Sequence, residues 1–412
     1  MKVRKLLPLL FASQLVMFSA AAAGASYQTI YSFAGGTDGE VPVGGVIFGK
    51  NGSLYGVTNS GGNDLCGSFL EFSGCGTVFE LRPQSDGSWE EDVLHVFNEF
   101  LDGGDPAAAV VMDGRGNLYG STQYYGPFSN GTLWRLTPSG SGWSERILHV
   151  FTGGSDGFWC YGLTLSQAHL FGTTYAGGPS DNGEVFELSE RPNGKWADKA
   201  LHYFSGGDRD GDSPSDAIIL DAHGNIFGTT YEGGPHIAGT VFEMQYKDGK
   251  WKETPIYFFQ GLPFGENFDG TNPTSGVVFD QQGNLYGTTD YGGSKGVGTI
   301  YELSPTGTGG WTEKVLYTFM DGKDGGHPSE LIIDEEGNLY GVTSGHNTAG
   351  SVFEFALETN GERSFKVLYH FTGGADGANP GGKLARDSSG NLYGTAAFGG
   401  INNYGVVFEI TP

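Results

Sequence analysis

The Asp-Gly dipeptide is the first candidate for chemistry, because it spaces carboxylates at regular intervals along the chain. Its copies begin at Asp38, Asp102, Asp156, Asp210, Asp269, Asp324 and Asp376. Carboxylate oxygens are hard ligands that suit Ca²⁺, so these residues could form a ring around a channel mouth. An Asp can also bond to the backbone of its own turn while the Gly takes a positive φ. The presence of the motif in every repeat favours this structural interpretation.

The acidic cluster of Asp208, Asp210 and Asp212 is the best single candidate for a metal site, of the Ca²⁺ type. It is not an EF-hand, because Ile219 stands where that loop has its last Glu. The chain contains no G-x-S-x-G, no H-E-x-x-H and no acid pair that stands apart from the repeat. The sequence therefore predicts no catalytic residue, and Ca²⁺ is the one cofactor that it suggests.

Aromatic residues that break the repeat are the best candidates for ligand binding. They are Phe158, Trp159, Tyr161, Tyr124 and Tyr125. We expect them on the face of the molecule that carries the longer loops, where function on repeat scaffolds tends to gather. Exposed rings beside carboxylates suit stacking on sugar rings, whereas the same residues could simply plug the opening.

The three cysteines divide into a pair and a single residue. Cys66 and Cys75 are close enough in sequence to close a small loop with a disulfide in an oxidising compartment. Cys160 is predicted to be a buried apolar residue, because no helix or basic neighbour is evident that would lower the pKa of its thiol.

Most histidines occupy positions that other repeats fill with Tyr. His95, His149 and His202 align with residues such as Tyr317, which predicts packing residues with a polar tip. His236, His327 and His346 fall in loops, and nothing in the sequence groups them into a metal-binding triad.

All these residues are positioned by a repeat whose best copy is 283–289, Gly-Asn-Leu-Tyr-Gly-Thr-Thr. The Leu-Tyr-Gly core, or a variant with Ile or Phe, begins at Leu54, Leu118, Leu170, Ile226, Leu285, Leu339 and Leu392. A spacing of roughly 50 to 65 residues is typical of solenoids, propellers and arrays. The repeat therefore predicts the architecture more firmly than the function.

Each copy carries four short runs that are typical of β-strands. In the fifth copy they are 276–280, 284–289, 299–303 and 315–319, rich in Val, Ile, Tyr, Phe and Thr and bounded by turn residues. No stretch shows an extended helical period. The Glu of the third run, for example Glu302, is better explained by strand pairing than by catalysis.

The strand-like runs are apolar on both faces, as expected of sheets packed between neighbouring sheets. Four-stranded sheets stacked radially form a β-propeller, whereas a linear β-solenoid usually has shorter rungs than this repeat. A fourth-type run, 30–33, precedes every other run, and the chain ends just after the third-type run 407–410. We therefore predict an all-β, seven-bladed β-propeller with four-stranded blades, closed by the N-terminal strand completing the last blade.

The combination of G-N-L-Y-G-T-T, a double Gly, V-F-E-L and L-Y-x-F-x-G-G-x-D-G resembles the Gloeo/Verruco (GloVer) tandem repeat of exported bacterial proteins. The resemblance covers nearly all of the chain after residue 23. It implies a secreted or surface propeller, and it brings no established activity and no catalytic residue. Many relatives continue into a C-terminal anchor, whereas this sequence stops at Thr411-Pro412, so the resemblance does not predict anchoring here.

Residues 1–23 have the pattern of a signal peptide, with Lys2, Arg4 and Lys5 before an apolar run and small residues at 21–25. This predicts a secreted protein, extracellular or periplasmic, with 24–412 as a single propeller domain and no membrane insertion after signal removal. The net charge of −25 argues against binding to nucleic acid or to anionic lipid.

The leading functional hypothesis is an exported, non-catalytic binding or interaction module, with a carbohydrate or another protein as its ligand on the long-loop face. We expect it to be a monomer. Two alternatives stay open, an extracellular glycan-active enzyme such as a lyase or hydrolase, and a structural protein of the cell envelope. Propellers host such enzymes as well as binding proteins, so the fold does not choose among these functions.

Overall fold

The structure is a computed structural model that describes residues 24–63, 66, 73–261, 269–320, 322, 324–345 and 347–412. Over these residues the chain consists of β-strands, loops and the short 3-10 helices η1 (Gly36–Asp38), η2 (Lys50–Gly52) and η3 (Gly207–Arg209). The prediction of an all-β chain is confirmed. The predicted signal peptide, residues 1–23, and His346 lie outside the described residues.

Five of the sheets in the described ranges contain four strands, paired in chain order. The first contains β6 (Val111–Met112), β7 (Leu118–Thr122), β8 (Thr132–Ser139) and β9 (Gly142–Val150). The second contains β10 (Phe158–Ser166), β11 (His169–Ala176), β12 (Glu184–Glu190) and β13 (Trp196–Tyr203). The third contains β15 (Ile219–Leu220), β16 (Ile226–Thr230), β18 (Thr240–Lys247) and β19 (Lys250–Phe258).

The fourth of these sheets contains β20 (Val278–Phe279), β21 (Leu285–Thr289), β22 (Thr299–Pro305) and β23 (Trp311–Thr318). The fifth contains β24 (Ile332–Ile333), β25 (Leu339–Thr343), β26 (Ser351–Leu357) and β27 (Arg363–His370). A small additional sheet pairs β14 (Gly211–Asp212) with β17 (Glu232–Gly233). In each four-stranded sheet the Leu-Tyr-Gly core lies on the second strand, as the repeat predicts.

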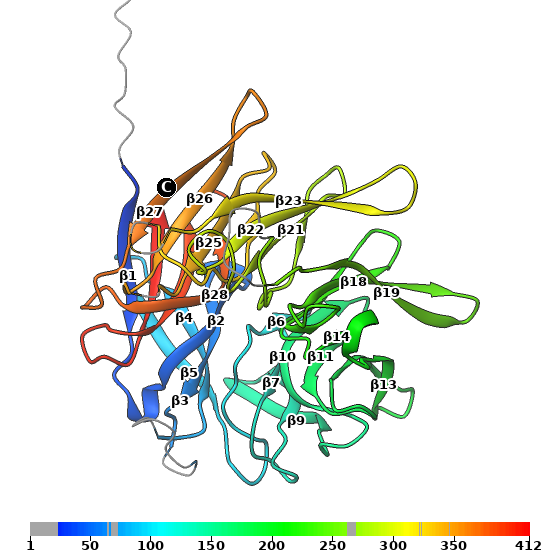
Figure 1. Cartoon of the computed structure of the whole chain (residues 1–412). Coiled ribbons are helices and arrows are strands. Elements are labelled where there is room, and N and C mark those ends of the chain that lie inside the picture. Colours follow the sequence, from blue (N-terminus) through cyan, green and yellow to red (C-terminus); the bar gives the residue numbers. More distant parts are fainter. Residues whose placement is uncertain are drawn as a thin grey trace, which may run out of the picture.

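The remaining strands form one sheet of eight, in the order β1-β30-β29-β28-β2-β3-β4-β5. Its first half contains β1 (Ser26–Ser32), β30 (Val406–Thr411), β29 (Leu392–Phe398) and β28 (Ala378–Arg386). Its second half contains β2 (Glu40–Phe48), β3 (Leu54–Ser60), β4 (Thr77–Pro83) and β5 (Trp89–Val96). A single parallel pair, Gly45 with Lys383, joins the halves, whereas β1 pairs with β30 from Ser26–Thr411 to Ser32–Val406. The N-terminal strand therefore lies beside the C-terminal strand, blue against red in Figure 1.

The register between second and third strands explains the recurring Glu. Tyr286 faces Glu302 across β21 and β22. At the equivalent places the Tyr55 hydroxyl donates to Glu80 Oε1 at 2.8 Å, and the Tyr340 hydroxyl donates to Glu354 Oε1 at 3.1 Å. The Glu therefore accepts a hydrogen bond across the strand pair, in agreement with the structural role expected from its periodicity.

The Gly of Leu-Tyr-Gly is required because an aromatic ring of the third strand lies directly over it. A Cβ on Gly287 would lie 2.3 Å from the Tyr301 hydroxyl oxygen. A Cβ on Gly56 would lie 2.5 Å from Cζ of Phe79. Both distances are far below van der Waals contact, so any larger residue would push the two strands apart.

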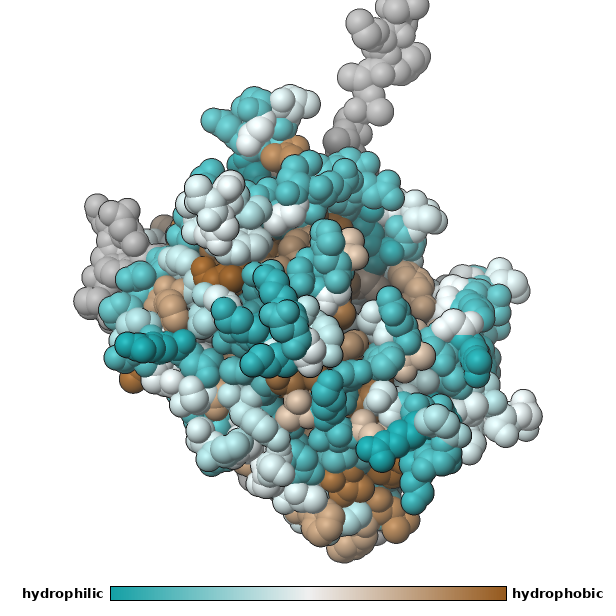
Figure 2. Space-filling view, turned by 90° about the vertical axis from the view of Figure 1, so that its right-hand side faces the viewer, coloured by the Kyte–Doolittle hydropathy of each residue, from teal (hydrophilic) through white to brown (hydrophobic). Residues whose placement is uncertain are grey.

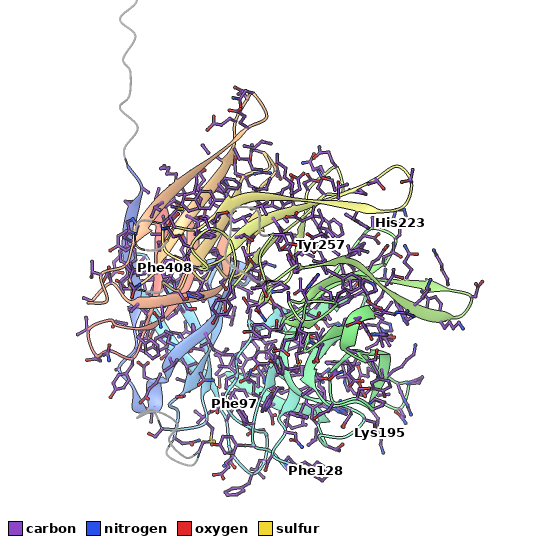
Figure 3. All side chains as sticks on the ribbon, viewed as in Figure 1. Phe97, Phe128, Lys195, His223, Tyr257 and Phe408 are labelled. Carbon is purple, nitrogen blue, oxygen red and sulfur yellow. A yellow bond between two sulfur atoms is a disulfide. The ribbon has the colours of Figure 1, made fainter. Side chains whose placement is uncertain are left out.

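The hydrophobic core lies between neighbouring sheets. One cluster joins Phe227 and Val241 of the β15–β19 sheet to Leu285, Tyr301 and Leu303 of the β20–β23 sheet. The strands are therefore apolar on both faces because each face is covered by a different neighbour. Figure 3 shows this contrast, with Phe97, Tyr257 and Phe408 inside the molecule and Phe128, Lys195 and His223 at its periphery.

The first strands line the middle of the molecule. In Figure 1, β2, β6, β10 and β28 lie toward the centre, whereas β1, β13, β23 and β27 lie toward the outside. Hydroxyls on several second strands tie one sheet to the next. For example, Thr229 Oγ1 donates to the Ser275 carbonyl at 2.8 Å, and Thr288 Oγ1 donates to the Ser329 carbonyl at 3.0 Å. This arrangement brings first-strand residues from different sheets around one space.

Candidate functional site

The carboxylates of the Asp-Gly dipeptides are occupied by their own turns. Asp324 accepts hydrogen bonds from the Tyr317 hydroxyl at 2.6 Å and from the Met320 amide at 3.0 Å. Asp376 does the same with the Tyr369 hydroxyl and the Thr372 amide, at 2.9 Å and 2.8 Å. The other Asp-Gly carboxylates bond in the same way to a backbone amide four to nine residues earlier, as Asp38, Asp102, Asp156, Asp210 and Asp269 show. The turn therefore explains the motif without a ligand.

A second repeated position has a strained backbone. A Pro, or Cys160 in one repeat, lies four residues after the Asp of each Asp-Gly dipeptide, and the residue before it has φ between 50° and 59°. These residues are Val41, Asp105, Trp159, Ser213, Asn272, His327 and Asn379. A non-glycine residue in this region costs about 1–3 kcal/mol unless its surroundings hold it there. Backbone hydrogen bonds to the preceding sheet supply that support. For example, the Asn272 amide donates to the Ala238 carbonyl at 2.8 Å. The side chain at this position varies from sheet to sheet, as expected of residues that serve a site and not the fold.

A cavity of about 930 Å³ lies between the first strands. Most of its lining is Gly, Ala, Ser and Val, because the strands approach each other closely there. A Cβ on Gly45 would lie only 2.1 Å from the Lys383 carbonyl oxygen. Against this background of small residues, the charged members of the described lining are Asp216, Glu330 and Lys383.

The three charged residues come from three different sheets and meet inside the cavity. Lys383 Nζ lies 3.7 Å from Glu330 Oε1. Asp216 accepts the amides of Ala217 and Gly276, both at 2.6 Å. Protein surrounds the Lys383 side chain, yet 44% of it is open to water, because it faces the cavity. The cavity therefore presents both a hydrogen-bond donor and acceptors to whatever enters it.

Electrostatics within the cavity favour a charged lysine and oppose a fully ionised acid pair. Glu330 raises the pKa of Lys383, although burial alone would lower it. Burial raises the pKa of Asp216 well above its usual value, and Glu330 raises it further. The two backbone amides and Lys383 act in the opposite direction. The cavity thus holds one carboxyl group that takes up a proton more readily than an ordinary Asp.

A chain of aromatic rings leads from the cavity to the surface. Tyr161 lines the cavity and lies 5.7 Å from Tyr175, measured between ring centroids. Tyr175 lies 6.0 Å from Trp159, which in turn contacts Phe158 at 5.0 Å and Tyr124 at 5.7 Å. Tyr124 is 38% exposed, so the outer end of the chain reaches solvent. Four of the five aromatic residues singled out in the sequence are therefore brought together.

Further aromatic and acidic side chains lie in the loops of the neighbouring sheets. His327 Nδ1 lies 2.9 Å from Asp290 Oδ1, and the His327 ring packs on Tyr291 at 5.1 Å. Asp290 and Tyr175 both raise the pKa of Tyr231, so Tyr231 lies near both of them. Burial raises the pKa of Asp105 to about 6. The rim thus combines aromatic faces with carboxylates.

The other predicted site residues lie elsewhere. Tyr125 packs against the hydrophobic cluster that contains Cys66 and Cys75. These two cysteines are joined by a disulfide, and Cys160 is free and buried, with burial raising the pKa of its thiol to about 12.

The three acids of the predicted Ca²⁺ site take separate roles. Asp208 lies exposed in η3, and Asp212 accepts a hydrogen bond from the Ser213 hydroxyl at 2.8 Å. Asp210 is buried and accepts hydrogen bonds from the amide and hydroxyl of Ser205, both at 2.8 Å. The structure therefore does not gather the three carboxylates around one point.

Sequence reasoning missed Asp216, Glu330, Lys383 and Tyr175. A signal was present for the first three, because the equivalent first-strand positions hold Gly, Ala or Ser in most other repeats. Tyr175 follows the Thr-Thr of its repeat, where Asn59 and Ser344 stand in others.

Surface hydrophobicity gathers at one end of the molecule. Figure 2 shows a mostly hydrophilic face with a hydrophobic area at its lower end, the end at which Figure 3 labels Phe128. Large exposed apolar residues in the loops of this region include Phe100 at 70%, Leu101 at 69% and Phe128 at 58%. Within the described residues, no helix has the length and apolar character needed to cross a bilayer.

The sequence model of the Gloeobacter/Verrucomicrobia repeat matches the chain over residues 15–159, 71–263, 145–307 and 257–412. No curated protein matches it in sequence. These matches together cover almost the whole chain, as do the repeats identified from the sequence.

Several solved structures share the fold. A periplasmic gluconolactonase of Pseudomonas aeruginosa is 16% identical with a TM-score of 0.50, over 83% of this chain and 93% of its own. A candidate 6-phosphogluconolactonase of Bacteroides fragilis is 13% identical with a TM-score of 0.50, over 81% and 86%. The extracellular domain of a candidate one-component system of B. thetaiotaomicron is 12% identical with a TM-score of 0.51, over 93% of this chain and 40% of that one. At these identities the similarity shows a propeller-like fold and nothing about activity.

Proposed function

The chain belongs to the Gloeobacter/Verrucomicrobia repeat family, and from this premise we propose that it is an exported, non-catalytic module that binds a carbohydrate at the rim of its central cavity. The observation that carries the proposal is the ring chain Tyr161–Tyr175–Trp159–Tyr124, which begins at a cavity holding Lys383 and Glu330. Aromatic faces suit the apolar faces of sugar rings. A few convergent polar groups at the base would bind hydroxyls and set orientation.

The proposed architecture is a seven-bladed ring of four-stranded sheets, in which β1 completes the last blade. Support comes from the five four-stranded sheets of the described ranges and the two halves of the eight-stranded sheet, which together give seven sets of four strands. The pairing of β1 with β30 and the bridge between Gly45 and Lys383 both fit a closed ring. Such closure would leave no long unpaired edge.

Export is proposed on two grounds. Residues 1–23 have the charge and apolar pattern of a signal peptide. The disulfide between Cys66 and Cys75 suits an oxidising compartment. The net charge of −25 would repel nucleic acid and anionic lipid, so we expect a monomer in solution whose partner is a glycan.

A glycan-active enzyme is the second candidate, and one observation favours it. Asp216 and Glu330 place two carboxyl groups in one cavity, and the pKa of Asp216 is raised. Two acids with different pKa values are the usual requirement for general acid and base roles. Against this, both oxygens of Asp216 already accept backbone amides, as expected of a residue that supports the strands.

A glycan array with the full mature chain, with and without EDTA, tests the proposal. We expect binding to a defined set of glycans, and mass spectrometry of the bound glycans after prolonged incubation should show no cleavage. Trp159→Ala should weaken binding about 3- to 10-fold, since one ring contact is worth about 0.5–1.5 kcal/mol. Tyr246→Ala is the matched control, because Tyr246 is 58% exposed at the end of β18, away from the cavity lining.

The outcomes separate the candidates. Binding that Trp159→Ala and Tyr246→Ala affect equally would contradict the proposed location. Cleaved products would favour the enzyme, and Asp216→Asn should then abolish them. Absence of both binding and products would reject both candidates.

A further inference from the structure

One position of the fourth strand reaches across to the neighbouring sheet. In each set of four strands a Tyr or His of the fourth strand lies beside the Asp-Gly carboxylate. The position four residues before this Tyr or His faces the equivalent Tyr or His and Asp of the preceding sheet. Phe365 occupies it against Tyr317, with the rings stacked at 4.1 Å. Tyr27 occupies it against Tyr369, stacked at 4.2 Å. On the other five fourth strands the position is acidic, and Glu145, for example, lies beside His95 and Asp102. The acidic members are Glu91, Glu145, Asp198, Glu253 and Glu313.

In two of these interfaces the described residues bring a His, an Asp and a Glu together. One holds His95, Asp102 and Glu145, and the other holds His202, Asp210 and Glu253. Within each, one nitrogen or oxygen from every residue lies within 4.8 Å of the others.

The histidine and the aspartate approach each other closely in both groups. His95 Nε2 lies 2.8 Å from Asp102 Oδ2, and His202 Nε2 lies 3.5 Å from Asp210 Oδ1. The Asp is almost buried in each group, whereas the His retains an exposed side-chain fraction of 18% or 23%. A small ion could therefore reach the site from the surface.

Several atoms that point into these groups lack a hydrogen-bond partner although water does not reach them. They are Glu145 Oε1, Glu253 Oε1 and His202 Nε2. A shielded polar atom without a partner destabilises the fold. A cation bound in each group would give these atoms a partner, because carboxylate oxygens and a neutral imidazole nitrogen are metal ligands.

The aspartates are already held in place by other groups, as metal ligands usually are. Asp102 accepts the Asn98 amide at 2.6 Å through Oδ1, which leaves Oδ2 toward His95. Asp210 accepts the Ser205 amide and hydroxyl through Oδ2, whereas Oδ1 accepts the Gly211 amide at 2.8 Å and lies 3.5 Å from His202 Nε2. The orientation of each carboxylate therefore does not depend on the ion.

We propose that these two groups are binding sites for a divalent transition-metal ion of the zinc class. One imidazole nitrogen and two carboxylate oxygens would supply three ligands, and water would complete a four-coordinate site. Such donors favour Zn²⁺ over Ca²⁺, which prefers six to eight oxygens. The Glu comes from β9 or β19 and the His from β5 or β13, so each ion would link neighbouring sheets.

The chain contains its own negative controls. His149, Asp156 and Asp198 occupy the equivalent third interface. There Asp198 is one carbon shorter than Glu145 or Glu253, and the ligand atoms of the three residues do not all lie within 4.8 Å of one another. At another interface Tyr257 stands beside Asp269 and Glu313, so the position accepts Tyr in place of His. We therefore expect two ions per chain and none at these interfaces.

The test is metal content of the untagged full chain after EDTA treatment, incubation with Zn²⁺ alone and extensive dialysis, measured by mass spectrometry of the metal. The wild type should retain two Zn²⁺ per chain. His95→Tyr and His202→Tyr should each retain one, and the double variant none. These substitutions install the residue that the repeat uses elsewhere, so circular dichroism should show unchanged folding.

Two further variants sharpen the result. His149→Tyr should leave both ions in place, whereas Asp198→Glu should raise the count from two to three by lengthening the acid at the third interface. The proposal is overturned if the double variant retains as much Zn²⁺ as the wild type, if His149→Tyr lowers the count, or if the wild type retains none.

Discussion

The ring of Tyr27 stacks on the ring of Tyr369, with centroids 4.2 Å apart and planes inclined by 15°. Tyr27 belongs to the N-terminal strand β1, whereas Tyr369 belongs to β27, and the Tyr27 hydroxyl also donates to the Asp376 carbonyl at 2.6 Å. The first strand thus pairs with β30 along its edge and packs against β27 across its face. The two ends of the chain are joined by side chains as well as by backbone.

Tyr27→Ala should destabilise the protein by about 2–4 kcal/mol, because it removes a large partly buried ring from this contact. Tyr27→Phe keeps the ring and loses only the hydroxyl bonds, so it should cost about 1 kcal/mol. Urea unfolding measures both values. Gln28→Ala is the control, since Gln28 is exposed on the same strand. Equal stability of Tyr27→Ala and Gln28→Ala would show that the Tyr27 contacts do not stabilise the packing of β1 against β27.

Gly287→Ala should destabilise the protein by at least about 1–3 kcal/mol, because the added Cβ would lie 2.3 Å from the Tyr301 hydroxyl oxygen. Gly307→Ala is the matched control. Gly307 has open space around it and no positive φ, so the change there should be within about 0.5 kcal/mol of zero. Thermal unfolding of the two variants decides the matter, and similar midpoints would contradict the close packing of second and third strands.

Glu184→Thr should stabilise the protein, and more so at high pH. Glu184 is fully buried, and neither carboxyl oxygen has a hydrogen-bond partner. Burial, with Asp198 and Asp156, raises its pKa to about 9. Equivalent positions in other sheets hold Thr240 or Thr299, each within 2.8 Å of a Thr hydroxyl on the second strand.

The pH dependence has a definite sign. Because the pKa of Glu184 is near 4.5 in the unfolded chain and about 9 in the folded one, the folded state loses stability as pH rises from about 4.5 to about 9. Threonine does not titrate, so the advantage of Glu184→Thr should grow between pH 5 and pH 9. Denaturation midpoints at pH 5, 7 and 9 measure it. A constant difference would mean that Glu184 has an ordinary pKa.

The sequence predicted the repeating elements well because they depend on local patterns. The run 284–289 has the composition of a strand, bounded by turn residues, and β21 covers Leu285–Thr289 of it with every residue buried. The Glu of the third strand and the Asp of the Asp-Gly dipeptide were also interpreted correctly as structural, because a feature present in every repeat serves what every repeat shares.

The charged cavity could not be predicted in the same way. Asp216, Glu330 and Lys383 lie on three different sheets, so their proximity depends on how the first strands approach one another. Asp208, Asp210 and Asp212 are neighbours in sequence, yet Asp210 accepts hydrogen bonds from Ser205 whereas Asp212 accepts one from Ser213. Asp208 lies in the 3-10 helix η3 and Asp212 in the strand β14, so the backbone does not keep the regular spacing that the sequence suggests.

The histidines illustrate a partial success. His202 packs against Phe204 at 4.8 Å, as a packing residue with a polar tip should. Its carboxylate neighbour Glu253 lies in the next sheet, and no local pattern connects them. Only the register between fourth strands of different sheets reveals that they meet.

Hydrogen–deuterium exchange with and without the best glycan from the array tests the central claim most directly, because it locates the bound ligand on the intact chain. We predict slower exchange in peptides covering 158–161, 174–176 and 327–330, with no change in the turns at 281–283 and 335–337. Protection confined to those turns, or spread evenly over the surface, would contradict a binding site at the rim of the central cavity.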